Sequence, residues 1–410
     1  MLIDEVKECS KCGICRSVCP VFLIANDEVM SPRGRLSLIE AMLEGVSISD
    51  IDTIRSCIKC SRCSVACPVG VKVERIIQSS RNILSEIPDN VRSVFRASFN
   101  PGEFKSLIES SKSDMDIKNE HQLFCSGKAK TLTKNEEQLP LWQLPLLFHG
   151  NAYLPELAEK TILDNYPEYI SPYIKERKKI ALFVGCSINY ANTNIADSLI
   201  ESLKKLGIGV FIPGGQICCG APMLLYGDTS TASEMARKNI SALRSDEFDA
   251  VITLCPACGV TMKSEYSQLL NEDIGNFVSK VCDASEFIYK STDYMSRSNK
   301  PSDVSVTYHD PCYLRIRQKV KKEPREILGK SAHLIEMKDA DKCCGLGGTL
   351  GIFHPEISIR IAEAKIESIV DSGADIVTTG CPGCITFLKD QLGSHGINKE
   401  VLHTVQMMNI

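Results

Sequence analysis

The chain has 410 residues, of which 43% are hydrophobic and 24% are charged, and its formal net charge is -4 at pH 7. These values are ordinary for a globular protein of two or three domains, and the acidic balance argues against general nucleic-acid binding. We find no apolar stretch long enough to span a membrane and no secretory signal after the Met-Leu-Ile-Asp-Glu start, so we expect a cytoplasmic protein.

The N-terminal part contains two runs in which three cysteines are separated by two-residue gaps and a fourth is followed by proline. This is the bacterial ferredoxin pattern, in which a tight loop wraps three thiolates around one cluster and the fourth ligand comes from the other run. We therefore assign one [4Fe–4S] cluster to Cys9, Cys12, Cys15 and Cys67, and another to Cys57, Cys60, Cys63 and Cys19. A pair of zinc knuckles is the alternative, although zinc sites commonly use separated Cys-x2-Cys pairs rather than triple runs.

Apolar spacing predicts a helix over residues 34–43, ended by Gly45, and a second helix over residues 73–86. Residues 1–87 are therefore predicted to form a helical two-cluster ferredoxin-like domain. Residues 88–177 are predicted to be a connecting segment, because residues 106–118 and 127–137 are polar. The apolar run 139–148 is either a strap packed on a domain surface or a contact with a partner subunit.

The C-terminal half repeats one order of strands and helices, which predicts two α/β domains with parallel sheets, over residues 178–300 and 301–410. Predicted strands end just before Cys186 and Cys255 in the first copy, and just before Cys312 and Cys381 in the second. Loops that follow parallel strands gather at one edge of a sheet. We therefore expect the cysteines of each copy to lie on one rim, and the duplication to set the two rims face to face.

Each copy offers five thiols where an ordinary cluster or zinc site needs four. The two sets are Cys186, Cys218, Cys219, Cys255 and Cys258, and Cys312, Cys343, Cys344, Cys381 and Cys384. Adjacent cysteines cannot readily serve two corners of one small cube, but they can span a more open cluster. The glycine after each adjacent pair removes a side chain where the backbone would pass close to inorganic sulfur. The alternative is an ordinary metal in each copy, with one thiol to spare.

The whole chain resembles the iron–sulfur proteins that join a two-cluster ferredoxin module to two cysteine-rich CCG domains. That group includes the D-type subunit of heterodisulfide reductase, the glycolate oxidase iron–sulfur subunit, lactate-utilisation iron–sulfur proteins and the C-type subunit of anaerobic glycerol-3-phosphate dehydrogenase. The segment Ser31-Pro-Arg-Gly-Arg35 looks like the glycolate and lactate side of the group. The complete Cys-x2-Cys pairs in both copies look like the heterodisulfide reductase side.

The resemblance implies that each set of five cysteines holds a noncubane [4Fe–4S] cluster, as is understood for the heterodisulfide reductases. There the disulfide of coenzyme M and coenzyme B is split between two such clusters. Disulfide cleavage needs two electrons, and two facing clusters could each supply one without releasing a free thiyl radical. The predicted function is therefore an iron–sulfur redox subunit that relays electrons from a partner through the ferredoxin clusters to paired CCG clusters and reduces a disulfide.

The alternative function is an electron-transfer subunit of a flavin-dependent glycolate, lactate or glycerol-3-phosphate dehydrogenase complex. The chain contains no convincing flavin or nicotinamide fingerprint, so a flavin would sit on another polypeptide. The expected partner is a flavoprotein or a membrane-bound b-type cytochrome, and membrane attachment would come through that partner. Nucleic acid is not expected as a partner.

Four further features have open roles. His309 adjoins the second set of cysteines and either protonates a leaving thiolate or is a satisfied structural histidine. The basic run from Arg315 to Arg325 either receives anionic substrate groups or forms a solvated helix face or docking surface. Cys125 and Cys282 have no companions in the sequence, and lone thiols are more often small buried hydrophobes than ligands.

Overall fold

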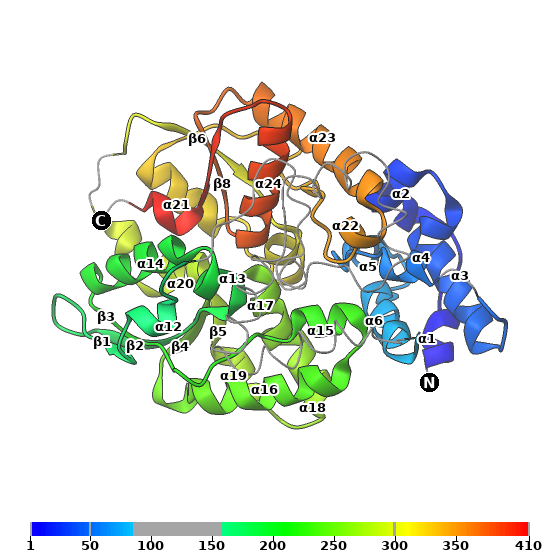
Figure 1. Cartoon of the computed structure of the whole chain (residues 1–410), viewed down its shortest axis with the longest axis horizontal. Helices are drawn as coiled ribbons and strands as arrows, with labels where there is room; N and C mark the ends of the chain where they lie inside the picture. The colour runs from blue at the N-terminus through cyan, green and yellow to red at the C-terminus, as the bar shows by residue number, and fades with distance from the viewer. Residues whose placement is uncertain (1, 49–50, 85–157, 298–300, 409–410) are drawn as a thin grey trace.

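The computed structural model describes residues 2–48, 51–84, 158–297 and 301–408 (Figure 1). Most of the predicted connecting segment lies outside these ranges, including Cys125 and the apolar run 139–148, so their roles stay predictions. Its last part, residues 158–177, contains helix α12 (Ile162–Asn165) and strand β1 (Tyr169–Ile170). None of the helices in the described ranges is both long and apolar enough to cross a membrane.

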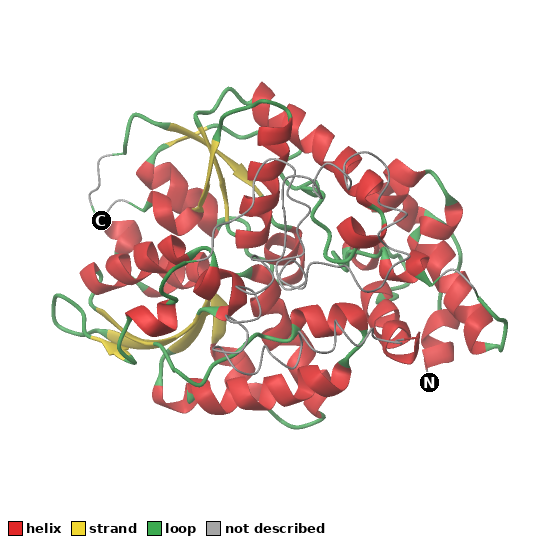
Figure 2. Cartoon of the chain, viewed as in Figure 1, coloured by secondary structure: helices red, strands yellow, loops and turns green. Residues whose placement is uncertain are grey.

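The described part of the N-terminal module is helical, as the apolar spacing predicts (Figure 2). Its elements are α1 (Leu2–Lys7), η1 (Ile14–Val18), α2 (Pro20–Ala25), η2 (Glu28–Met30), α3 (Pro32–Leu43), α4 (Asp52–Arg55), α5 (Arg62–Ala66) and α6 (Val73–Leu84). The two predicted helices are α3 and α6, which pack together through Leu36, Ile39, Ile76 and Ile77. The cysteines lie in the short turns around this apolar core, which therefore positions both runs.

The start of α3 explains the first half of the Ser-Pro-Arg-Gly-Arg segment. The Ser31 hydroxyl caps the helix by accepting a hydrogen bond from the Gly34 amide at 2.9 Å, and Pro32 occupies the first turn, where its missing N–H costs nothing. A Cβ atom on Gly34 would lie 1.9 Å from the carbonyl oxygen of Glu28. Residue 34 must therefore be glycine for α3 to pack against η2.

The two arginines of this segment hold the cysteine loops in place. The Arg33 guanidinium donates to the carbonyl of Lys11, inside the first cysteine run, at 2.9 Å. Arg35 is buried and donates to the carbonyl of Thr53 at 2.7 Å and to the Ser56 hydroxyl at 2.8 Å, just before the second run. The segment that resembles the glycolate and lactate side of the group thus has a structural role here.

The first C-terminal copy is built on a five-stranded sheet of order β1-β3-β2-β4-β5. The edge strand β1 is antiparallel to β3, and the other neighbours are parallel, as predicted. The strands are β2 (Lys178–Phe183), β3 (Ile208–Phe211), β4 (Ala250–Thr253) and β5 (Val281–Asp283). The helical elements are α13 (Gly185–Tyr190), α14 (Thr193–Lys205), α15 (Ala221–Tyr226), α16 (Thr229–Leu243), η4 (Ser245–Glu247), α17 (Pro256–Val260), the π-helical turn η5 (Thr261–Glu265), α18 (Tyr266–Leu270), α19 (Gly275–Lys280), α20 (Ala284–Ser291) and η6 (Tyr294–Ser296).

The second copy has a parallel four-stranded sheet of order β7-β6-β8-β9. Its strands are β6 (Ser305–His309), β7 (His333–Leu334), β8 (Ile376–Thr379) and β9 (Glu400–His403). Its helical elements are the π-helical turn η7 (Tyr313–Arg317), α21 (Glu323–Ser331), α22 (Leu350–Phe353), α23 (Pro355–Asp371), α24 (Pro382–Ser394) and η8 (Thr404–Met407). The predicted arrangement, a helical module followed by two α/β copies with parallel sheets, is confirmed.

The two copies share one apolar core. Ile180 and Ile252 of the first sheet belong to the same buried cluster as Val377 and Val401 of the second. A side chain also joins the copies directly, because His403 Nε2 lies 3.2 Å from the carbonyl oxygen of Leu254. The two sheets therefore pack together through a continuous apolar core.

The N-terminal module packs against both copies (Figure 1). Helix α2 lies on α23 of the second copy, and α6 lies on α15 of the first. The Gln78 amide on α6 donates to the carbonyl of Leu224 at 2.7 Å, and the Thr349 hydroxyl donates to the carbonyl of Arg55 at 2.5 Å. All three units therefore meet at a common centre.

We expect Gly34→Ala to lower the free energy of unfolding by about 1–3 kcal/mol, the usual cost of overpacking a tight site. The matched control is Gly329→Ala in α21, where an added Cβ would meet no atom within 4 Å. That change should stabilise by about 0.5–1 kcal/mol, because alanine favours a helix interior. Denaturant unfolding under anaerobic conditions measures both. Equal effects of the two substitutions would contradict the packing assigned to Gly34.

Candidate functional site

The thiols of the first copy lie at the carboxyl ends of its central strands. Cys186 follows β2 in the first turn of α13, and the Cys218-Cys219 pair lies between β3 and α15. Cys255 follows β4 as the N-cap of α17, and Cys258 lies within that helix. The parallel sheet thus brings five thiols, distant in sequence, to one rim, as the strand pattern predicts.

These five thiols are in mutual contact. Side-chain hydrogen bonds connect Cys186 to Cys218, Cys218 to Cys219, and Cys258 to both Cys219 and Cys255. Hydrogen bonds from Cys218 and Cys258 lower the pKa of Cys219 to about 6. The first copy therefore contains a group of buried thiols, and the central thiol, Cys219, accepts hydrogen bonds from two others.

The second copy places its thiols in the same way. Cys312 is the N-cap of η7 after β6, and the Cys343-Cys344 pair precedes α22. Cys381 is the N-cap of α24 after β8, and its sulfur accepts a hydrogen bond from the amide of Cys384 at 3.4 Å. The two copies therefore present equivalent thiol sets from equivalent elements.

The central thiol of the second copy is Cys344. Its Sγ lies 3.5 Å from Cys384 Sγ, and hydrogen bonds with Cys343 and Cys384 hold its pKa well below the usual range. His309, at the end of β6, adds a further hydrogen bond to it. One ligand atom each from His309, Cys344 and Cys384 lies within 4.8 Å of the others, a spacing that could hold a metal ion.

The glycine after each cysteine pair has a left-handed backbone, with φ of +87° at Gly220 and +105° at Gly345. A Cβ on Gly345 would lie 2.5 Å from the carbonyl oxygen of Ser358, and one on Gly220 would lie 3.4 Å from Ala232. The sequence suggested room for inorganic sulfur. The structure adds a further reason for glycine, which is the left-handed backbone at both positions together with close packing of Gly345 on α23, and the approach of inorganic sulfur stays a prediction.

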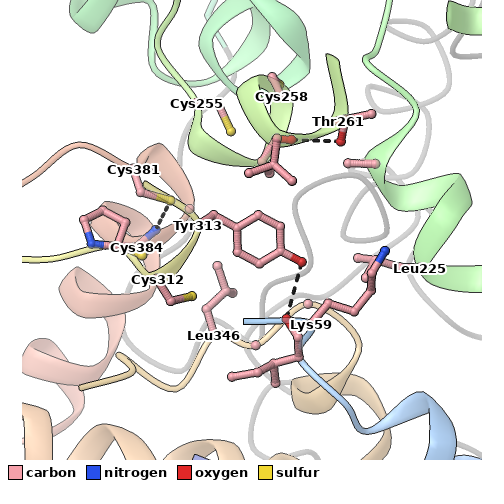
Figure 3. A pocket seen from close by; sticks show the side chains of 18 of the residues that line it. Lys59, Leu225, Cys255, Cys258, Thr261, Cys312, Tyr313, Leu346, Cys381 and Cys384 are labelled. Carbon is pink, nitrogen blue, oxygen red and sulfur yellow. Dashed lines mark hydrogen bonds between the residues drawn. The ribbon is translucent and has the colours of Figure 1, made fainter. Parts of the chain in front are cut away.

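Both thiol sets face one cavity of about 190 Å³ (Figure 3). Among the described residues, every cysteine of the two sets except Cys218 lines it. The rest of the wall is mainly apolar, and includes Leu224, Leu225, Leu346, Val260 and Ile58. In Figure 3, Cys255 and Cys258 approach the cavity from one copy, and Cys312, Cys381 and Cys384 from the other. The expectation of two facing rims agrees with this arrangement.

The ferredoxin-type thiols form two groups. Cys19, Cys57, Cys60 and Cys63 line a second, much smaller cavity of about 20 Å³, and burial raises the pKa of Cys60 to about 12. Cys9, Cys15 and Cys67 pack against the α3 and α6 core, in an apolar cluster that also contains Cys57 and Cys63. Burial raises the pKa of Cys15, and the nearby Cys9, Cys19 and Cys12 thiols add to that effect. Cys19 thus lies with the second run, as the exchange of fourth ligands requires.

The second group adjoins the second C-terminal copy. Cys60 and Cys343 are buried in the same apolar cluster, with Cys312 packed against it. Burial raises the pKa of Cys312, and the nearby Cys60 thiol adds to that effect. The N-terminal module therefore brings its second run of cysteines to the thiols of the second copy. The sequence alone does not reveal which copy this run contacts.

Sequence reasoning missed an ion cluster at the junction of the three units. Lys59 Nζ lies 3.5 Å from a carboxylate oxygen of Glu265, and Arg317 donates to the same oxygen at 2.9 Å. All three side chains line the large cavity and are at most 10% exposed. Burial lowers the pKa of Lys59 to about 8. Burial alone would raise the pKa of Glu265, but the two cations hold it below its ordinary value.

The remaining arginines of the basic run form ion pairs within the protein. Arg315 pairs with the buried Asp310 at 2.9 Å, and Arg325 pairs with Asp310 at 2.7 Å and with Glu336 at 2.5 Å. Arg317 pairs with Glu265 as described above. These arginines are therefore largely neutralised by carboxylates, which agrees poorly with the idea of a free anion-binding run.

The residues of the large cavity fit iron–sulfur clusters. Burial raises the pKa of Cys312, and hydrogen bonds with Cys344, together with burial, raise the pKa of Cys343 and of Cys384. A bound metal would deprotonate such thiol ligands. His309 Nδ1 is buried and has no hydrogen-bond partner among the described residues. Soft sulfur ligands packed against one another in an apolar wall suit iron–sulfur clusters.

Comparison with known families agrees with this geometry. A family model described as "4Fe-4S dicluster domain" matches residues 5–71. The description "Cysteine-rich domain" (CCG) matches twice, at residues 180–263 and 306–389. The matched regions contain all of the ferredoxin-type cysteines and both sets of five thiols.

Several curated proteins are similar to this chain. The probable glycolate oxidase iron-sulfur subunit of Bacillus subtilis is 28% identical over 97% of this chain and 91% of its own length. The B-type subunit of fumarate reductase (CoM/CoB) from Methanothermobacter marburgensis is 36% identical over 57% of this chain and 45% of its own length. The D-type subunit of dihydromethanophenazine:CoB–CoM heterodisulfide reductase from Methanosarcina acetivorans is 28% identical over 59% of this chain and 60% of its own length. The chain spans about half the length of the relatives that it matches at more than 30% identity.

We expect Glu265→Gln to lower the free energy of unfolding by about 3–5 kcal/mol, because it leaves two buried cations without their anion. The control is Glu272→Gln, whose partner Arg237 is exposed and whose ion pair should contribute about 0–1 kcal/mol. Since the pKa of Glu265 is lowered, its contribution is present above pH 4.5 and is lost as pH falls through its folded value. Denaturant unfolding at several pH values tests this, and equal losses in both variants would contradict it.

Proposed function

This chain belongs to the iron–sulfur proteins that join a 4Fe-4S dicluster domain to CCG cysteine-rich domains, and we propose that it is a redox subunit that reduces a disulfide with electrons from a partner. Its relatives include iron–sulfur subunits of heterodisulfide reductase, glycolate oxidase and fumarate reductase. The single observation that carries the proposal is the cavity that both thiol sets line.

We assign the ligands as the motifs suggest. Two [4Fe–4S] clusters are held by Cys9, Cys12, Cys15 and Cys67, and by Cys57, Cys60, Cys63 and Cys19. Two noncubane [4Fe–4S] clusters are held by Cys186, Cys218, Cys219, Cys255 and Cys258, and by Cys312, Cys343, Cys344, Cys381 and Cys384. When bound, these groups would supply one-electron transfers. The thiol contacts within each set support the assignment.

The shape and lining of the cavity suit a disulfide as substrate. A disulfide has two sulfur atoms, and this cavity offers one thiol set from each copy, so each substrate sulfur can meet a different copy. The apolar wall formed by Leu224, Leu225 and Leu346 would exclude water from the reacting sulfurs. Cys60 beside Cys312 connects the N-terminal module to this cavity. A single thiol set on an open surface would offer none of these features.

The second candidate is an electron-transfer subunit for oxidation of a 2-hydroxyacid or of glycerol 3-phosphate. The match to a probable glycolate oxidase subunit over 97% of the chain favours it. In that case a flavoprotein partner supplies the electrons, whereas a membrane-bound b-type cytochrome is the partner suited to disulfide reduction.

Electron paramagnetic resonance on anaerobically purified protein distinguishes the two functions. Under mildly oxidising conditions, a thiol such as coenzyme M should produce a new paramagnetic signal if the cavity binds substrate sulfur. Spectra that are identical with and without thiol would reject disulfide chemistry. Reduction of the protein by a glycolate- or lactate-oxidising flavoprotein, with no response to thiols, would support the second candidate.

Iron content provides a direct test of the ligand assignment. We expect Cys219→Ser to remove one cluster's worth of iron and sulfide, because Cys219 is the central thiol of the first copy. The matched control is Cys282→Ser in β5, which lies outside the lining of the large cavity in the described structure and should keep the full content. Iron and acid-labile sulfide analysis of the two proteins is the measurement. Full iron content in the Cys219 variant would contradict the assignment.

A further inference from the structure

The two copies differ at one position at the end of the first strand of each repeat. His309 is the last residue of β6, and it pairs in register with Thr379. Phe183 is the last residue of β2, and it pairs in register with Thr253. Each lies three residues ahead of the first cysteine of its copy. Histidine and phenylalanine therefore occupy equivalent places beside the two thiol sets.

In the second copy this position supplies a hydrogen-bond donor. His309 is 1% exposed, lines the cavity, and makes a hydrogen bond with Cys344, the central thiol. One of its ligand atoms lies within 4.8 Å of the sulfurs of Cys344 and Cys384. Its Nδ1 has no hydrogen-bond partner among the described residues. The imidazole is therefore buried and faces the sulfur atoms.

In the first copy the equivalent position supplies only apolar surface. Phe183 is 1% exposed and belongs to the same buried cluster as Cys219 and Cys258. These two thiols are the equivalents of Cys344 and Cys384. A phenyl ring supplies no donor, and the hydrogen bonds that lower the pKa of Cys219 come from Cys218, Cys258 and the backbone of Ala221.

A second difference points in the same direction. Lys365 on α23 is 1% exposed and lies near Cys344, donating to the carbonyls of Asp339 at 2.6 Å and Ala340 at 3.2 Å. Lys365 lies 16 residues ahead of Cys381, and the residue 16 ahead of the equivalent Cys255 is the neutral Asn239 on α16, which donates to the carbonyl of Cys218 at 2.9 Å. The second copy thus has a buried cation where the first has an amide.

We propose that His309 and Lys365 make the second thiol set the better acceptor of negative charge, so that a cluster bound there has a higher reduction potential than one bound by the first. The proposal rests on the proposed function, since it presumes that both sets hold iron. Hydrogen bonds to cluster sulfurs and nearby positive charge stabilise the reduced form, which carries one more negative charge.

The position of the N-terminal module indicates which copy receives electrons first. Cys60 adjoins Cys312 of the second copy through a shared apolar cluster. An electron that leaves the ferredoxin-type site beside Cys60, oxidising it by one unit, therefore reduces the second copy first. The second copy, once reduced, passes an electron on to the first copy, so the two sulfur atoms of a bound disulfide meet sites of different reduction potential.

Redox titration of the full chain, reduced stepwise with dithionite and followed by electron paramagnetic resonance, tests the proposal. Cys219→Ser and Cys344→Ser identify the signals of the first and second copy. We expect His309→Phe to lower the equilibrium constant for one-electron reduction of the second copy by roughly tenfold. This corresponds to a midpoint potential lower by about 59 mV. Lys365→Gln, which keeps a donor and removes the charge, should shift the same signal in the same direction.

Reciprocal substitutions in the first copy provide matched controls. Phe183→His and Asn239→Lys should raise the midpoint of the first copy and leave that of the second unchanged. Equal midpoints in the wild-type protein, or midpoints that none of the four substitutions moves, would overturn the inference while leaving the proposed function intact. Absence of any C-terminal signal together with low iron content would instead reject the proposed function, and the inference with it.

Discussion

The structure depends on one constraint, which is that the carboxyl edges of two parallel sheets must face each other across a shared apolar cavity. Each sheet alone would display its thiols to solvent. The apolar core that continues from Ile252 to Val401, and the contact of His403 with the backbone of Leu254, fix the relative position of the sheets. The approach of thiols from both copies to one cavity follows from this shared core.

The parts of the site that sequence could predict are those that follow from local pattern. A buried strand that ends just before Cys186 or Cys381 places the thiol at a sheet edge, because all parallel strands of a sheet end on the same side. The ion cluster could not be found in this way. Lys59, Glu265 and Arg317 are brought together only when three units assemble, and none of them has a local pattern that marks a partner so distant in sequence.

The segment that resembles one side of the group does not lie at the cavity where the thiols meet. The Ser-Pro-Arg-Gly-Arg segment caps α3 and ties Arg35 to the backbone of Thr53, so its conformation supports the cysteine loops and contributes nothing to the lining of the cavity. The thiol pairs, in contrast, line the cavity directly. Substrate chemistry is therefore better argued from Cys255, Cys258 and their counterparts in the second copy than from the N-terminal segment.

The docking of the N-terminal module also bears on how the protein matures. Ile58 and Lys59, from the loop between two ferredoxin cysteines, form part of the cavity wall, and Cys343 behind them is only 8% exposed. With the module docked, Cys343 is closed off from solvent and from other proteins. A metal that binds this thiol would therefore have to enter before the module docks or while it is displaced, so the docked shape links metal binding in the second copy to the movement of a separate module.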